Sequence, residues 1–197
     1  MPVSDVPKLR LVMNSRPNND KIAWYVLRVT YQREIVAQEK LNAMGVESYL
    51  PLKRVRRHGR FGRFEWRVEA ALHNYLFVKA SLNRIKEVKT DIPYLRFFMG
   101  YDSDGERRPQ FVPDKDMESF IILTSQETEM LKYLDPYSID LTKGDRVRVL
   151  EGPFKGAEGV YMNISKKHEK CVVVQIQGVV AVATAHISSA AVEKINN

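Results

Sequence analysis

Residues 53–78 read KRVRRHGRFGRFEWRVEAALHNYLFV and decide the fold, because two structural signals follow one another in this stretch. The first part alternates basic and apolar residues around Gly59 and Gly62, which is typical of a projecting two-stranded ribbon. The second part, residues 72–78, is apolar and rich in aromatic residues, which suits a central strand. The sequence therefore predicts a ribbon that projects from a sheet and a strand that anchors it.

The positive charge of the chain is concentrated in this ribbon. Residues 53–67 contain seven cations and one anion, Glu65, so this segment carries +6 of a formal chain total of +7. Arginine outnumbers lysine here, and Phe61, Phe64 and Trp66 are interleaved with the cations, which favours contact with phosphates or unpaired bases over a merely solvated hairpin. The candidate nucleic-acid contacts are Arg54, Arg56, Arg57, Arg60, Arg63 and Arg67.

Composition places the chain among soluble globular proteins. Its 197 residues, 44% hydrophobic and 28% charged, suit one medium domain or two small ones. No apolar window approaches the roughly 20 residues that span a bilayer, and the N-terminus has no signal-peptide apolar core. We therefore expect a cytoplasmic protein that makes no membrane contact.

No constellation of catalytic or metal-binding residues can be identified. The four histidines lack metal-ligand spacing, and no nucleophile elbow or phosphate-binding glycine loop is present. The single cysteine, Cys171, excludes an internal disulfide and is interpreted as inert core because it stands in a valine run. The chain is therefore predicted to be non-enzymatic and to need no metal or cofactor.

The order of predicted elements indicates an α+β fold with four segments. Residues 1–20 are predicted to be a disordered leader, and residues 21–125 an α/β sandwich with a mostly antiparallel sheet. Residues 126–142 lose periodicity and are interpreted as a linker. Residues 143–197 combine short β-branched runs with glycine turns, which favours a small β-barrel of about five strands.

The central strand leaves one question open. Alternation places Tyr75 and Phe77 on one face of the sheet and Leu76 and Val78 on the other. If helices cover only one face, the other is a docking surface for a partner, whereas a covered face would be ordinary core. The residues by themselves favour neither alternative.

Several motifs resemble the NusG family of transcription elongation factors, and they span about Ile22 to Val192 in the order of that family. Those of its N-terminal domain are Trp24-Tyr25-Val26, Asn74-Tyr75-Leu76-Phe77-Val78, Ile92-Pro93 to Gly100, and Val112-Pro113. Those of its KOW domain, an SH3-like barrel, are the segments from Lys143 to Val149 and from Glu151 to Gly156. The form of the Tyr75 motif is similar to specialised members of the RfaH and UpxY type, the latter associated with capsule operons.

The resemblance implies a function and a set of partners. The first domain would bind the clamp helices of the β′ subunit of bacterial RNA polymerase, reducing pausing or termination as a monomer. The KOW domain would recruit a ribosomal protein or the Rho factor, and the ribbon would contact DNA or nascent RNA. The implied polymerase contacts are Leu72, Tyr75, Phe77, Arg28 and Val36; Lys40 would approach nucleic acid, and Phe154 and Lys155 the KOW partner. The alternative is a ribosome-associated or general RNA-binding KOW protein.

Overall fold

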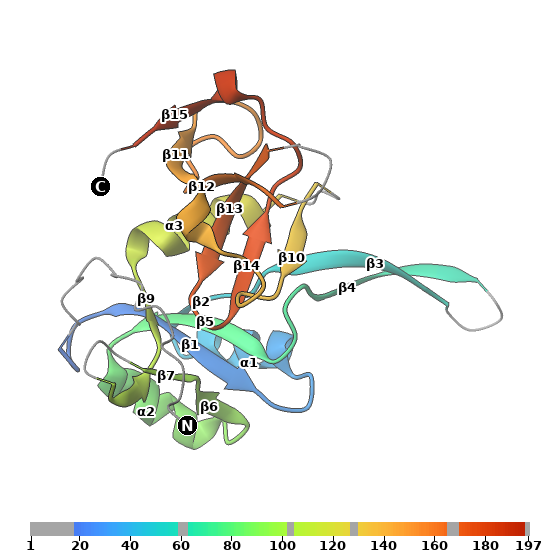
Figure 1. Ribbon diagram of the computed structural model, residues 1–197. Helices are drawn as coiled ribbons and strands as arrows, with labels where there is room; N and C mark the ends of the chain where they lie inside the picture. The colour runs from blue at the N-terminus through green and yellow to red at the C-terminus, as the bar shows by residue number, and fades with distance from the viewer. Residues whose placement is uncertain (1–17, 59–62, 102–104, 127–129, 165–169, 196–197) are drawn as a thin grey trace, which may run out of the picture.

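The first half of the chain is built on one antiparallel sheet. The computed structural model describes residues 18–58, 63–101, 105–126, 130–164 and 170–195. The sheet has the order β2-β5-β1-β6, and β9 also pairs with β1 (Figure 1). Its strands are β1 (Ala23–Val29), β2 (Glu47–Tyr49), β5 (Tyr75–Ala80), β6 (Leu95–Phe97) and β9 (Phe111–Val112). The antiparallel sheet predicted for this region is confirmed.

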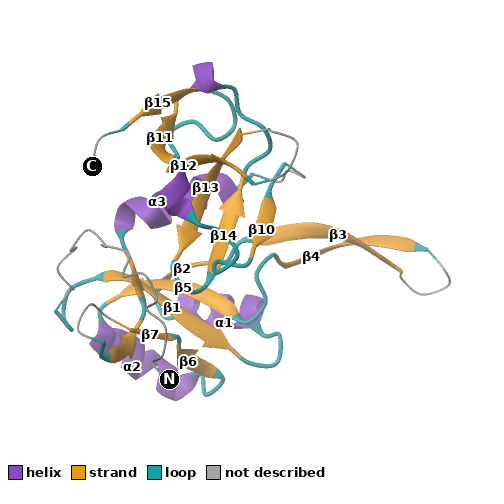
Figure 2. Cartoon of the chain, viewed as in Figure 1, coloured by secondary structure: helices purple, strands orange, loops and turns teal. Residues whose placement is uncertain are grey.

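Two helices, α1 (Glu34–Ala43) and α2 (Leu82–Asp91), cover one face of this sheet (Figure 2). Leu41 and Ile85 on these helices are buried in one cluster with Leu76 of β5. The helix α1 begins only at Glu34, because Tyr31 and Gln32 have φ values of 66° and 54°, which an α-helix does not allow. It ends at Ala43, and Gly45, just past the C-cap residue Met44, has the left-handed φ of 69° that commonly terminates a helix.

The third helix, α3 (Asp114–Thr124), lies on the opposite face. It follows Pro113 and begins with two acidic residues, Asp114 and Asp116, which favour a helix N-terminus. Its Phe120 ring packs against the Phe77 ring, with the ring centroids 5.0 Å apart. Both faces of the central strand are therefore covered.

Two small ribbons extend from this sheet. The larger pairs β3 (Leu52–His58) with β4 (Phe64–Ala70) and projects away from the body of the molecule (Figure 1). The smaller pairs β7 (Met99–Tyr101) with β8 (Arg107–Pro109). Phe98 separates β6 from β7, and its N–H donates to the Val26 carbonyl while its own carbonyl accepts from the Gln110 N–H.

The second half of the chain forms a six-stranded antiparallel sheet with the order β10-β14-β13-β12-β11-β15. Its strands are β10 (Lys132–Leu134), β11 (Asp145–Val149), β12 (Glu158–Asn163), β13 (Lys170–Ile176), β14 (Val180–Ala183) and β15 (Val192–Lys194). Two 3₁₀ turns, η2 (Leu141–Lys143) and η3 (Ser189–Ala191), connect them. The turn between β13 and β14 contains Gly178 at a φ of 70°, as a tight hairpin requires.

The strand β10 lies inside the segment interpreted as a linker. Its Tyr133 pairs with Val182 of β14, and its side chain packs against the core. A three-residue strand beside Asp135 and Pro136 is too short for its alternation to be visible in the sequence. The division into domains stays a prediction, but part of residues 126–142 belongs to the second sheet.

The helix α3 joins the two halves of the molecule. A single buried cluster includes Phe77 from the first sheet, Phe120 from α3 and Val147 and Val174 from the second sheet. The Oγ of Ser119 accepts the backbone N–H of Glu158 at 3.0 Å across this contact. The second sheet thus packs on α3 and on the sheet face that carries Phe77.

Candidate functional site

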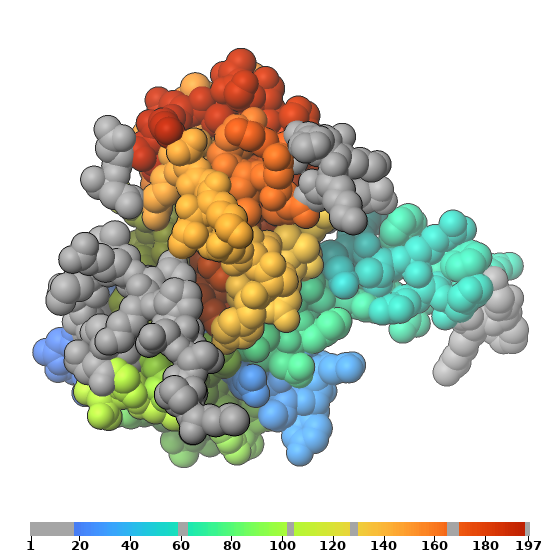
Figure 3. All heavy atoms as spheres, in the orientation of Figure 1, coloured from blue at the N-terminus to red at the C-terminus, as the bar shows by residue number. Residues whose placement is uncertain are grey.

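The β3–β4 ribbon stands clear of the rest of the protein (Figure 3). Its seven residue pairs run from Leu52 opposite Ala70 to His58 opposite Phe64. Directly opposed residues of an antiparallel pair point to the same side, and neighbours along each strand point to opposite sides. The register therefore sorts the ribbon into two faces of different chemistry.

One face, which we call the aromatic face, combines large apolar side chains with arginines. By register it carries Arg54, Arg56, His58, Phe64, Trp66 and Val68. The Arg56 guanidinium carbon lies 4.1 Å from the Phe64 ring centroid, and that of Arg54 lies 5.7 Å from the Trp66 ring. Both carboxylates of the ribbon's strands, Glu65 and Glu69, stand on the other face.

The other face, which we call the paired face, contains ion pairs between its side chains. By register it carries Lys53, Val55, Arg57, Glu65, Arg67 and Glu69. Arg57 donates from Nε and Nη2 to the two oxygens of Glu69, at 2.9 and 2.7 Å. These bonds lower the pKa of the Glu69 carboxyl, which keeps it ionised. Arg67 pairs more loosely with Glu65 at 3.4 Å.

The structure does not bring the predicted nucleic-acid contacts together on one face. Arg54 and Arg56 are on the aromatic face, and Arg57 and Arg67 are on the paired face. Arg63 is exposed just before β4, and Arg60 lies outside the described residues. Lys40 belongs to the helix α1 and not to the ribbon. Its Nζ lies 5.6 Å from the Tyr94 ring centroid.

The predicted polymerase contacts are only partly accessible. Phe77 is completely buried under Phe120, and Leu72 is 9% exposed in the same cluster. Tyr75 is half-buried, with its ring edge-on to Phe98 at a centroid distance of 5.7 Å. The Arg28 guanidinium carbon lies 5.8 Å from the Tyr75 ring and 5.4 Å from the Phe98 ring. Tyr75 and Arg28 are thus brought together, while Phe77 is enclosed.

A cavity of about 300 Å³ opens beside this pair. It is lined by Arg28, Val29, Thr30, Asn74 and Tyr75. Asn74 has a φ of 68°, and its N–H donates to Oε1 of the buried Glu34 at 2.6 Å. Sequence reasoning missed Glu34, since an acidic residue in the first turn of a helix is ordinarily attributed to the helix dipole.

The remaining predicted contacts lie apart from this cavity. Val36 is exposed on α1. Phe154 lies in the turn between β11 and β12 but is only 2% exposed, whereas its neighbour Lys155 is exposed. A partner that reaches this turn would therefore meet Lys155 and not the Phe154 ring.

Other chemistry in the described residues is sparse. Cys171 is buried, and burial raises the pKa of its thiol, which opposes formation of a reactive thiolate. No three His, Cys, Asp or Glu side chains gather as a metal site in the described part of the chain. Over the same residues, no helix has the length and apolar character to cross a bilayer.

Comparison with known proteins identifies a family for the first half. A family model described as "Transcription termination factor nusG" matches residues 22–121, which is just over half of the chain. This range holds the first sheet, the β3–β4 ribbon, α1, α2 and most of α3. No curated protein matches the chain.

Proposed function

The chain belongs to the NusG family, and we propose that it is an elongation and antitermination factor that binds the clamp helices of the bacterial RNA polymerase β′ subunit. The observation that carries this proposal is the family match over residues 22–121. That range contains the Tyr75 and Arg28 pair as well as the basic ribbon. Members of this family are transcription factors rather than enzymes, so the protein acts by binding.

The polymerase contact is assigned to the Tyr75 side of the sheet. Tyr75 and Arg28 border the cavity, so an apolar helix tip with a polar edge could reach them in the observed arrangement. Phe77 and Leu72 are buried beneath α3 and the second sheet. Binding through these two residues requires the second half to move, whereas binding through Tyr75, Arg28 and the exposed Val36 does not.

The finer features of the proposal concern the kind of family member. We assign the chain to the specialised, operon-directed paralogues of the RfaH and UpxY type, supported by the form of its motif from Asn74 to Val78. The second sheet would be the KOW barrel, supported by its six short antiparallel strands and its glycine turns. Its partner would be a ribosomal protein or Rho, approached through Lys155. The basic ribbon, with Lys40, would contact DNA or nascent RNA.

The test is a pull-down that compares how much RNA polymerase the purified full-length protein and its Tyr75→Ala variant retain. We expect the substitution to reduce retention about tenfold or more, because a central interface aromatic commonly contributes 2 kcal/mol or more. Tyr101→Ala is the matched control, since Tyr101 is an exposed tyrosine on β7 outside the cluster. Equal retention by the wild type, Tyr75→Ala and Tyr101→Ala would refute the assignment of the polymerase contact.

The exposed ribbon also suits the second candidate, a ribosome-associated or general RNA-binding KOW protein. That function predicts tight binding to free RNA and no retention of RNA polymerase. Binding would weaken with salt at a slope of about −0.7 per phosphate neutralised. The same pull-down, with free RNA in a parallel arm, separates the two functions.

A further inference from the structure

We propose that the aromatic face of the β3–β4 ribbon binds single-stranded nucleic acid by stacking bases on Trp66 and Phe64, while the paired face makes no part of this site. The inference rests on the nucleic-acid contact of the proposed function and deepens it. It names one face, one structural class of nucleic acid and the residues that hold it.

The exposure of the aromatic face requires an explanation. Three large apolar residues at alternate positions of β4, Phe64, Trp66 and Val68, are each at least half exposed, and Trp66 is 65% exposed. Single exposed apolar residues are ordinary, but a contiguous row on one face marks a binding surface. The exposure of all three side chains means that the described part of the chain leaves this row open to solvent.

The charges of the aromatic face identify the occupant as an anion with flat apolar parts. Arg54 and Arg56 reach from β3 toward β4, where their guanidinium groups lie near the rings of Trp66 and Phe64. A base that stacks on the Phe64 ring takes the place of the Arg56 guanidinium, which can then reach the phosphate of the same nucleotide. Aromatic platforms beside a row of cations are the common arrangement for binding single strands.

The paired face has a different chemistry. Its three cations, Lys53, Arg57 and Arg67, stand beside two carboxylates, Glu65 and Glu69. The bidentate pair between Arg57 and Glu69 occupies the donors that a phosphate would need. An approaching phosphate chain would also meet the negative charge of both glutamates.

The rings select a single strand over a duplex. In a duplex the flat faces of the bases are stacked on one another, and only the backbone and the base edges are accessible. Unpaired bases can be splayed out and stacked on aromatic side chains. A site that consisted only of charge would bind both forms and would use the cations of both faces.

The experiment compares two double variants of the full-length protein that remove the same charge. Arg54→Ala with Arg56→Ala alters the aromatic face, and Arg57→Ala with Arg67→Ala alters the paired face. The probes are a 12-nucleotide single-stranded RNA, the DNA of the same sequence, and its DNA duplex. We expect the first double variant to lose about tenfold or more in single-strand affinity and its salt slope to fall by about 1.4, as two lost phosphate contacts require. The second should lose less than about threefold.

Tryptophan fluorescence reports stacking directly. The chain has two tryptophans, and Trp24 is 5% exposed whereas Trp66 is exposed. Single strands should quench the Trp66 emission. Trp66→Phe should abolish the quench but retain most of the affinity, whereas Trp66→Ala should lose both.

The outcomes distinguish failure of the stacking site from failure of the nucleic-acid contact on which it rests. Equal losses by the two double variants, or duplex binding as tight as single-strand binding without quenching, would overturn the stacking site but leave a charge-based nucleic-acid contact intact. Binding of none of the three probes would overturn both. A preference for RNA or for DNA among the single strands supports the site and identifies which strand it takes.

Discussion

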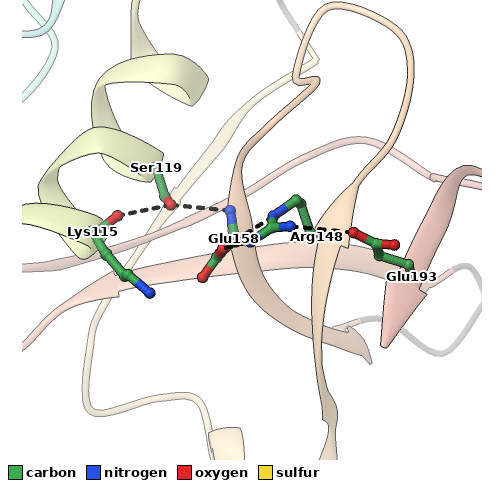
Figure 4. Close-up of polar contacts among 5 residues, drawn as sticks. All are labelled: Lys115, Ser119, Arg148, Glu158 and Glu193. Atoms are coloured by element: carbon green, nitrogen blue, oxygen red, sulfur yellow. Dashed lines mark hydrogen bonds and ion pairs between the residues drawn. The ribbon is translucent and has the colours of Figure 1, made fainter. Parts of the chain in front are cut away.

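The Oγ of Ser119 on α3 accepts a hydrogen bond from the backbone N–H of Glu158 on β12 at 3.0 Å, and this bond joins the two halves of the protein (Figure 4). The same hydroxyl donates to the carbonyl of Lys115 at 2.9 Å. The carboxylate of Glu158 accepts from Arg148, whose guanidinium also reaches Glu193 on β15. One buried hydroxyl thus connects the helix that covers Phe77 to three strands of the second sheet.

Replacing Ser119 with alanine is expected to loosen this contact. The Glu158 N–H would lose its partner at a part-buried position, at a cost of about 1–3 kcal/mol. If Phe77 contributes to polymerase binding after the second sheet has moved, Ser119→Ala should raise the affinity for RNA polymerase. The measurement is polymerase affinity together with hydrogen exchange of the amides in α3.

The control for this prediction is Ser125→Ala. Ser125 is an exposed serine at the end of α3, and its hydroxyl donates within its own helix to the carbonyl of Ile122. This variant should leave both measurements unchanged. An unaltered polymerase affinity in Ser119→Ala, with exchange of α3 increased, would show that Phe77 takes no part in binding.

The Phe154 ring is expected to stabilise the second sheet rather than to bind a partner. It is buried with Val147 and Val149 of β11 in the cluster shared with α3. Phe154→Ala should lower the free energy of unfolding by about 3–5 kcal/mol, as is usual for removal of a core phenylalanine. Lys155→Ala should change it by less than about 0.5 kcal/mol, because the side chain is exposed. Urea denaturation of both variants checks this, and comparable stabilities would contradict the core assignment.

Gly159 in β12 is expected to tolerate no side chain. A Cβ at this position would lie 2.6 Å from the backbone oxygen of Val173 on the paired strand β13. A backbone atom in a ladder cannot move away cheaply, so Gly159→Ala should separate β12 from β13 and lower the melting temperature. At Gly100 the obstructing atom is the end of the Gln110 side chain, which can rotate away, so Gly100→Ala should cost much less. Circular dichroism melting curves of the two variants measure this difference. A melting temperature that falls more in Gly100→Ala than in Gly159→Ala would mean that the β12–β13 contact is loose.

Alkaline pH is expected to weaken the packing of β10. Burial, and secondarily the nearby Tyr49 phenol, raises the pKa of Tyr133 from 10.0 to about 12. Between these pH values the folded protein keeps the Tyr133 proton, whereas the unfolded chain releases it. The contribution of Tyr133 to the free energy of unfolding is therefore fully present below pH 10 and is lost as the pH rises toward 12. The loss should reach about 3 kcal/mol.

Tyr133→Phe tests this directly, because phenylalanine has no proton to lose. Unfolding by urea at pH 9 and at pH 11 should show a smaller loss of stability in the variant than in the wild type. Identical losses would mean that Tyr133 ionises freely and that β10 is not packed against the second sheet in solution.

Much of the first half follows from local sequence. The apolar run at Tyr75 predicts the central strand, and the alternation of basic and apolar residues around Gly59 and Gly62 predicts the ribbon. These signals are local, since strand alternation and turn chemistry depend on residues that are near one another in the chain. The motifs around Tyr75 also point to the family that the match over residues 22–121 shows.

Features that depend on contacts between distant segments were decided by the tertiary structure. The sequence left open whether the Phe77 face is core or docking surface, and the structure covers it with Phe120 and the second sheet. The strand β10 forms because Tyr133 pairs with Val182 of β14, about fifty residues later in the chain. No local pattern predicts this pairing.

The ribbon shows both kinds of information most clearly. The sequence of residues 53–67 predicts its charge, its aromatic residues and its two-stranded form. The sequence does not predict the division into an aromatic face and a paired face, because that division depends on the register that sets Arg56 opposite Trp66. A slip of one residue would exchange the faces of one strand relative to the other, so only the folded pairing determines which arginines stand with the rings and which with the glutamates.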